Sequence, residues 1–293
     1  MTLRHLKIYV AVCETGTLTA AGKKLFIAQP AVSVAISELE AHYGVRFFDR
    51  ISNRLHITDT GRQFKQYAQH IISLYEEMEH NITNGDGIGT LRIGSSITIA
   101  NCFLPMLIKE LKEQHPQLII KVTVQNSELI ESNILSNHID IGLIEGSVHN
   151  GYVNSIPFMK DKLVFIAPSE HPLAQKKEVK VSDLEFQDFL LREHGSAGRE
   201  IFDGIVDTYA LSVNRVWESV STQAIICGVE QGLGLSILPY LLVHEEVENG
   251  KIIAFGLKDI SLTRVLSIVH HKNKFLSKSA LDFIEICQTR MRS

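Results

Sequence analysis

A cluster of hydroxyl side chains lies where one predicted strand ends. Ser95, Ser96 and Thr98 follow the predicted strand 91–94 and lead into a helix. Hydroxyl groups, together with the free N–H groups at the start of a helix, suit a small anion. Polar side chains also follow other predicted strands: Asn126, Glu145, Arg192 and Thr222. Because ligands of open α/β sheets bind outside the carboxyl ends of the strands, we expect these side chains in one cleft that holds a small carboxylate or inorganic oxyanion.

Simpler roles for the same side chains stay open. Hydroxyl and amide side chains are common helix caps and turn residues, so each of them could have a purely structural role. Arg192 could also pair with an acid such as Glu145 instead of a ligand.

The chain lacks the usual catalytic and metal-binding patterns. Gly232-Leu233-Gly234 has no third glycine and precedes a predicted strand, so it is no dinucleotide loop. No GxSxG, P-loop or HExxH motif occurs. His270 and His271 would point to opposite faces of a strand, and the four cysteines form no CxxC pair. We therefore predict no enzymatic activity, no cofactor and no metal, in a reducing cytoplasm.

A second group of polar side chains recurs at helical spacing near the N-terminus. Gln29, Ser33 and Ser37 would share one helix face, which carries no arginine. The opposite side would be buried through Val32, Ile36, Leu39 and Tyr43. Pro30 suits the first turn of this helix, and Gly44 suits its C-cap.

The surrounding residues predict a small helical unit with a hairpin. Leu3, Leu6, Val10 and Cys13 form one apolar stripe, which ends at Gly16. A second helix would begin at Thr17 or Thr19 and run to Leu25, with small residues that allow close helix packing. After the third helix, two short strands bracket a turn at Ser52-Asn53, flanked by Arg50 and Arg54. This order is that of a winged helix-turn-helix.

Charge is distributed unevenly along the chain. The formal net charge of all 293 residues is −4. Residues 1–65 nevertheless contain nine lysines and arginines against five acidic residues. This excess of positive charge favours contact with phosphate groups, although an ordinary solvated surface is the alternative.

A long helix follows the hairpin. Its apolar residues recur with alternating spacings of four and three, which is a heptad pattern: Phe64, Ala68, Ile71, Tyr75, Met78 and Ile82. Such a seam predicts pairing of two subunits, and packing of the helix on its own domain is the alternative. The glycine-rich segment 84–89 would end the helix as a linker.

From residue 90 onward, predicted strands alternate with helices. Alternation of this kind is typical of a parallel sheet with helices on its faces. The predicted strands are 91–94, 118–124, 139–144, 163–167, 189–192, 214–217, 235–238 and 265–270. The predicted helices are 104–111, 129–135, 201–209, 222–231 and 280–290. No run of about 18 uncharged apolar residues occurs, so we expect no contact with a membrane.

An ordered set of motifs resembles the LysR-type transcriptional regulators. The set comprises Ala20-Ala21 with Leu25, Gln29-Pro30-Ala31-Val32-Ser33, Leu39-Glu40, Gly44, Phe47-Phe48-Asp49-Arg50, and Thr58 with Gly61. Near the C-terminal half, residues 192–199 and 232–239 also match the family, so the resemblance covers nearly the whole chain. It implies an α/β fold with an N-terminal winged helix-turn-helix, a long linker helix and a two-lobed effector domain like the periplasmic binding proteins.

The resemblance implies that the third helix enters the major groove of double-stranded DNA. Family members often carry arginine or lysine after the serine that matches Ser33, whereas this chain has Val34. Glutamine reads adenine and apolar groups contact the thymine methyl, so we expect half-sites rich in A·T. The expected DNA contacts are Gln29, Pro30, Ser33, Val34 and Ser37 for the bases, with Lys23, Lys24, Arg50 and Arg54 for the phosphates. Ser37 could instead be a plain exposed residue.

The resemblance also implies domain limits and partners. We expect a DNA-binding domain at 1–59, a dimerisation helix at 60–87 and an effector-binding domain at 88–293. Lobe one would contain 88–160 and 265–293, lobe two 161–264, and the chain would cross between them near 158–162 and 262–265. The chain would bind an inverted-repeat operator as a homodimer or homotetramer, respond to a small anionic effector between the lobes, and have RNA polymerase as a further partner. The alternative is a soluble ligand-binding protein whose N-terminal unit binds other proteins.

Overall fold

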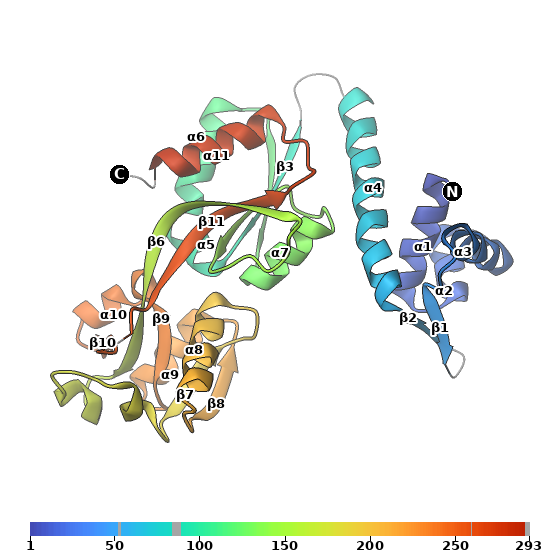
Figure 1. Ribbon diagram of the computed structural model, residues 1–293. Coiled ribbons are helices and arrows are strands. Elements are labelled where there is room, and N and C mark those ends of the chain that lie inside the picture. The colour runs from blue at the N-terminus through green and yellow to red at the C-terminus, as the bar shows by residue number, and fades with distance from the viewer. Residues whose placement is uncertain (52–53, 84–88, 259, 291–293) are drawn as a thin grey trace. The chain divides into compact units, whose positions relative to one another are not determined.

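The computed structural model describes residues 1–51, 54–83, 89–258 and 260–290 (Figure 1). At residues 50, 51, 54, 77 and 80–83 it describes only the backbone. The chain divides into two compact units, the first containing residues 1–89 with 135–138 and the second containing residues 90–134 with 139–293.

The first unit is a winged helix-turn-helix followed by a long helix. Its elements are α1 (Leu3–Thr15), α2 (Leu18–Leu25), α3 (Gln29–Tyr43), β1 (Phe48–Ile51), β2 (Arg54–Ile57) and α4 (Asp59–Thr83). Thr17, and not Thr19, caps α2, because its side chain accepts a hydrogen bond from Ala20 N at 3.2 Å. Gly16 and Gly44 end α1 and α3 in the left-handed region, as predicted. The strands β1 and β2 pair antiparallel, while the predicted turn at 52–53 lies outside the described residues.

Tyr9 forms the centre of this unit's core. The ring is fully buried and lies 4.9–5.3 Å from the ring centroids of Phe47, Phe48 and Phe64, and its hydroxyl donates to Gly61 O at 2.9 Å. It therefore joins α1 to the hairpin and to α4. The predicted stripe of α1 omitted Tyr9, and the predicted burial of Tyr43 is wrong. Tyr43 is 43% exposed, because it lies in the last turn of α3 and packs through one side only, on Phe47 and Phe64.

The second unit contains two lobes built on a shared pair of long strands. The order of its main sheet is β10-β6-β11-β5-β3-β4, with β9 also paired to β6, and β7 and β8 form a separate pair. The strands are β3 (Thr90–Ser95), β4 (Ile119–Val124), β5 (Ile141–Glu145), β6 (Val153–Pro168), β7 (Asp188–Arg192), β8 (Asn214–Ser219), β9 (Ser236–Pro239), β10 (Ile252–Phe255) and β11 (Thr263–His271). The helices are α5 (Ile97–Cys102), α6 (Leu104–Gln114), α7 (Ser127–Leu135), α8 (Ala197–Thr208), α9 (Thr222–Glu230), α10 (His244–Glu248) and α11 (Lys278–Arg290), with short 3-10 turns at Pro172–Gln175, Val181–Leu184 and Tyr240–Leu242.

The strands of this unit are not all parallel, which corrects the prediction of a parallel sheet. The strand β3 pairs parallel with β4 and β5, and β7 pairs parallel with β8. By contrast, β11 pairs antiparallel with β5 and β6, and β6 pairs antiparallel with β9 and β10. The reason is that β6 leaves lobe one and β11 returns to it, so these two strands run in opposite directions.

The strand β6 passes from one lobe to the other at residues 162–163. Val153 to Lys162 pair with β11, whereas Leu163 to Pro168 pair with β9 and β10 (Figure 1). The sequence predicted crossings near 158–162 and 262–265, and the lobe limits that go with them stay a prediction. Because β6 is continuous through the crossing, the two lobes are joined by hydrogen-bonded strands instead of flexible loops.

In each lobe, helices cover both faces of the sheet, while the edge strands β4 and β8 stay largely exposed. In lobe one, α6 and α11 pack together on the core that includes Leu107 and Phe283 (Figure 1). On the other face α7 approaches closely, since a Cβ at Gly142 would lie 2.6 Å from Ile130 Cγ2. In lobe two, successive residues of β6 alternate between two cores, one shared with α8 and the other with α9.

A buried ion cluster stabilises lobe one beside β5. Asp140 accepts from Arg92 N at 2.7 Å and pairs with Lys274 Nζ at 2.7 Å, and the Lys274 side chain is almost fully buried. Burial by itself would raise the pKa of Asp140, but the hydrogen bond from Arg92 and the charge of Lys274 hold it below its usual range.

Replacing Asp140 by Asn should destabilise the second unit by about 3–5 kcal/mol at neutral pH, because the buried Lys274 loses the carboxylate that pairs with it at 2.7 Å. A lowered folded-state pKa contributes stability above the unfolded pKa, which is lost as pH falls. The difference between the two proteins should therefore shrink below about pH 4. Chemical unfolding followed by the fluorescence of Trp217, the sole tryptophan, measures this. An equal difference at pH 7 and pH 3 would contradict it.

Candidate functional site

The exposed face of α3 around Gln29, Ser33 and Ser37 carries no lysine or arginine, and the exposed acid Glu38 lies beside it. Gln29, Pro30 and Ser37 are exposed, Ser33 is half-buried, and Val34 is 55% exposed. Pro30 lies in the first turn, where its missing N–H leaves no hydrogen bond unmade. Opposite this face, Val32, Ala35, Ile36 and Leu39 are buried in the core of the unit. The helix therefore presents one amide, hydroxyls and a methyl-rich side chain to solvent.

Lysines at the end of α2 provide the described positive charge near this face. Lys23 and Lys24 are both exposed, and Lys24 pairs with Glu14 at 2.6 Å. Arg50 and Arg54 lie on β1 and β2, but their side chains are outside the described part of the chain. Of the two predicted phosphate contacts whose side chains are described, Lys24 is thus paired with an acid, whereas no ion pair to a described side chain is found for Lys23.

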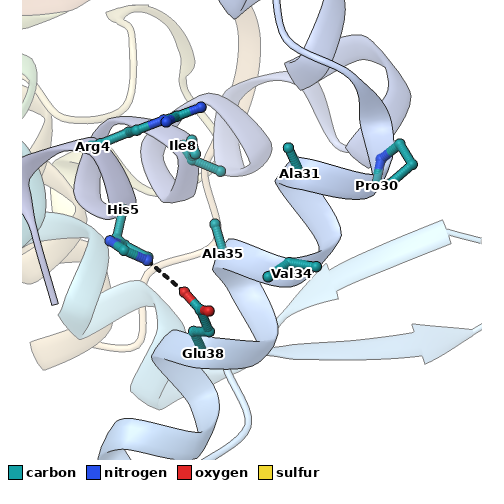
Figure 2. Close-up of a pocket in the computed structure, with 8 residues that line it drawn as sticks. All are labelled: Arg4, His5, Ile8, Pro30, Ala31, Val34, Ala35 and Glu38. Atoms are coloured by element: carbon teal, nitrogen blue, oxygen red, sulfur yellow. Dashed lines mark hydrogen bonds and ion pairs between the residues drawn. The ribbon is translucent and has the colours of Figure 1, made fainter.

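A hollow of about 410 Å³ lies between α1 and α3 (Figure 2). Its lining is Arg4, His5 and Ile8 from α1 with Pro30, Ala31, Val34, Ala35 and Glu38 from α3. His5 Nε2 and Glu38 Oε2 are 2.8 Å apart and close one end. Arg4 and Ala31 were not predicted as part of this surface, although Arg4 lies one turn of α1 before Ile8. The apolar part of the α3 face therefore continues toward α1.

The predicted heptad seam of α4 divides into two parts. Ala68 is fully buried and Phe64 stacks on Phe47 at 4.5 Å, so these two residues belong to the core of their own unit. Their assignment to a subunit interface is corrected for this reason. Ile71, Tyr75 and Met78 are 44%, 38% and 47% exposed. The side chain of Ile82 lies outside the described part.

In lobe one, the predicted hydroxyl groups surround a carboxylate of the chain itself. Ser96 Oγ donates to Glu145 Oε1 at 2.7 Å, and Thr98 N donates to the same oxygen at 3.2 Å. Arg264 Nη1 donates to Glu145 Oε2, and Arg264 Nη2 donates to Thr98 Oγ1 at 3.0 Å. Ser95 is fully buried, and its hydroxyl donates to Ser96 O at 3.1 Å.

Arg264 also pairs with Asp161, which lies on the other crossing strand. The distance from Arg264 Nε to Asp161 Oδ2 is 2.8 Å, and both side chains are almost fully buried. Burial raises the pKa of Asp161, the charge of Arg264 lowers it and Glu145 raises it again, with a net rise. Sequence reasoning did not find Arg264 or Asp161. The available signal was that both lie at the predicted crossings between the lobes.

In lobe two, Arg192 is paired with its neighbour in the chain. Its Nε and Nη2 donate to the two carboxylate oxygens of Glu193 at 2.8 and 3.0 Å, and its Nη1 donates to Thr222 Oγ1 at 3.3 Å. The alternative of an Arg192–Glu145 pair is therefore wrong. Arg192 pairs with Glu193, and Glu145 pairs with Arg264. Arg199 supports this group by donating to Arg192 O at 3.1 Å.

The two lobes meet through the start of α7 and the loop after β7. Asn126 Nδ2 donates to Glu193 Oε1 at 3.3 Å and to His194 O at 3.2 Å. Glu128 N donates to Gly195 O at 3.2 Å. The predicted ligand residues thus form two groups, one around Glu145 with Ser96 and Thr98, and one around Glu193 with Asn126, Arg192 and Thr222.

The described residues contain neither a metal-binding cluster nor a membrane-spanning helix. Across 1–51, 54–83, 89–258 and 260–290, no cluster of three or more metal-binding side chains could hold an ion. In the same ranges, no helix combines the length and the apolar character needed to span a bilayer.

Two family models together match almost the whole chain. Residues 3–62 match the bacterial regulatory helix-turn-helix of the lysR family, and residues 84–292 match the LysR substrate binding domain. The chain is 32% identical over 287 residues to the uncharacterized HTH-type transcriptional regulator YeiE of Escherichia coli, covering 98% of this chain and 97% of that one. It therefore belongs to the LysR family of DNA-binding transcriptional regulators with an effector-binding domain.

Solved structures share the fold of the whole chain and of the effector-binding domain. Full-length OxyR from Pseudomonas aeruginosa has a TM-score of 0.65 at 22% identity, covering 100% of this chain and 95% of that one. The regulatory domain of CcmR from Synechocystis, solved in complex with 2-PG, has a TM-score of 0.65 at 24% identity, covering 70% of this chain and 98% of that one. The winged helix-turn-helix, the linker helix and the two-lobed domain were thus correctly predicted from the sequence.

Proposed function

We propose that this regulator reads an inverted-repeat operator as a homodimer or homotetramer, and that a small anionic effector bound between the two lobes changes its grip on DNA. The proposed domain limits are 1–59, 60–87 and 88–293, with the lobes divided at 160–161 and 264–265. The exposed, arginine-free face of α3 is the observation that carries the proposal. The chain would act in the cytoplasm, without enzymatic activity, and RNA polymerase stays a predicted partner.

The proposed DNA contact follows from the chemistry of the α3 face. Gln29 can donate to and accept from one adenine, and Val34 offers methyl groups to thymine. Lys23 and the rim residue Arg4 supply positive charge on elements next to α3. Because phosphate contacts fix position while base contacts specify sequence, Lys23 and Gln29 should affect binding in different ways.

Two self-association faces support the proposed oligomers. Ile71, Tyr75 and Met78 give α4 an exposed apolar stripe. The second unit has edge strands at β4 and β8, both with exposed apolar residues such as Val122 and Trp217. An exposed sheet edge and an exposed apolar helix face each favour a partner, and a second copy of the chain can pair with both by symmetry. Two independent faces are what a tetramer of two dimers requires.

The proposed effector contact is Arg192. Its partner Glu193 lies in the loop that follows β7, outside any strand pairing, so an incoming anion can replace the Glu193 carboxylate through a rearrangement of that side chain. Glu193 also accepts from Asn126 across the lobes. Exchange of Glu193 for an effector anion would therefore change a contact between the lobes, as a ligand-driven shift between two assemblies requires.

Selection of duplexes from a randomised pool by the full-length protein should yield A·T-rich half-sites in inverted orientation. On the selected duplex, Lys23→Ala should reduce the log–log salt slope by about 0.9 with little change in base preference. Gln29→Ala should leave the slope unchanged and relax preference at one adenine by about 1–3 kcal/mol. Filter binding at several salt concentrations measures both. A flat salt dependence in the wild-type protein would contradict the proposal.

Ile71→Asp should weaken self-association through α4, because the change places a charge in the exposed apolar stripe. Gln66→Asp, an exposed position elsewhere on the same helix, is the matched control. Sedimentation velocity should show smaller assemblies for Ile71→Asp only, together with at least tenfold weaker binding to the selected duplex. Equal sedimentation of both variants would exclude α4 as the dimer interface.

Thermal-shift screening of small carboxylates and inorganic oxyanions on the full chain tests the effector contact. A compound that binds the folded protein raises its melting temperature. Any such shift should disappear in Arg192→Ala, while duplex binding persists. A shift that survives this substitution would place the effector elsewhere.

A further inference from the structure

The donors predicted to bind an effector anion in lobe one already bind Glu145. The Ser96 hydroxyl, the Thr98 N–H and the Arg264 guanidinium, here called the lobe-one donor set, all donate to its two carboxylate oxygens. These are charge-assisted hydrogen bonds, which are about twice as strong as neutral ones. The side chain of Glu145 is 8% exposed and that of Arg264 is 2% exposed. Glu145 therefore occupies the position that an oxyanion would take.

The main chain of Glu145 is held at both ends. The residue ends β5 and pairs with Leu266 of β11. Ser127 Oγ donates to Glu145 O at 2.9 Å, and Glu145 N donates to Ser127 Oγ at 3.2 Å. Glu193, by contrast, lies in a loop and its main chain has no such strand pairing. Glu145 is thus much harder to displace than Glu193.

The charge balance of this cluster also opposes a second anion. One guanidinium, Arg264, faces two carboxylates, Glu145 and Asp161, and all three side chains are almost fully buried. Burial is the main cause of the raised pKa of Asp161, and the nearby charge of Glu145 adds to the rise. A further anion would have to enter this environment against like charge in a region of low dielectric.

We propose that Glu145 is a specificity-determining residue, because its carboxylate fills the lobe-one donor set and excludes a carboxylate or phosphate group of the effector from it. This proposal rests on the proposed function and deepens it. The anionic group of the effector would then bind Arg192, and the other end of the effector would lie against lobe one next to the Glu145 carboxylate. Effectors with an anionic group at each end are therefore disfavoured.

Removal of the carboxylate should open the lobe-one donor set to an added anion. Glu145→Ala leaves Ser96, Thr98 and Arg264 with room for acetate or sulfate. Asp161→Asn is the matched control, since it removes one negative charge from the same cluster but keeps Glu145 in place. The melting temperature of the full chain is measured in acetate, sulfate and chloride at equal ionic strength, followed by calorimetric titration.

We expect Glu145→Ala to bind acetate or sulfate at least tenfold more tightly than the wild-type protein and Asp161→Asn. Folding of Glu145→Ala only in the presence of acetate or sulfate would support the proposal equally. Similar affinity in Glu145→Ala and Asp161→Asn would overturn it, because charge and not occupancy would then be the cause. If Glu145→Ala does not fold in any of these salts, Glu145→Ser, whose short side chain also leaves the donor set open, is titrated, and an affinity equal to that of the wild type overturns the proposal.

This test is independent of the proposed DNA and effector functions. It uses neither a duplex nor an effector, and Arg192 is unchanged in every variant. A thermal shift that survives Arg192→Ala, together with a gain of anion binding in Glu145→Ala, would refute the proposed effector contact only.

Discussion

The second unit depends on the pairing of Arg264 with Glu145 and Asp161. Arg264 lies on the strand that returns to lobe one, Asp161 on the strand that leaves it, and Glu145 at the end of a strand within lobe one. A buried guanidinium is tolerated only when it is paired and hydrogen-bonded, so the three side chains fix the geometry of the crossing together. Loss of one partner would leave a buried charge at the point where the lobes join.

The two groups of residues predicted to bind a ligand differ in how rigidly the protein holds the carboxylate that accepts their hydrogen bonds. The donors around Glu145 are satisfied by a strand residue, whereas Arg192 is satisfied by the loop residue Glu193, which also contacts Asn126 across the lobes. A ligand can change an equilibrium only through its differential affinity for two states. The Arg192–Glu193 pair offers such a difference, because replacement of the Glu193 carboxylate by a ligand alters the contact with Asn126 between the lobes. The Arg264–Glu145 pair instead determines which ligands can enter.

Local signals predicted the helices and their ends, while contacts distant in sequence were missed. Pro30, Gly16 and Gly44 act on the backbone next to them, so they placed α1 and α3 correctly. The direction of β11 and the first half of β6 depend on pairing between strands about 100 residues apart, which no local pattern encodes. Glu145 and Arg264 are 119 residues apart, so the sequence predicted Glu145 and the hydroxyl cluster in one cleft but not that the Glu145 carboxylate is held by Arg264 and these hydroxyls.

The first unit combines an exposed face of α3 that carries no lysine or arginine with a small positive surface. Hydroxyl-radical footprinting of the full chain on a duplex selected by it tests the central claim of DNA recognition most directly. Two copies of α3 in successive major grooves predict two protected patches on one face of the duplex, about 34 Å or one helical turn apart. Absence of protection, or a single patch with no symmetry mate, would contradict the account.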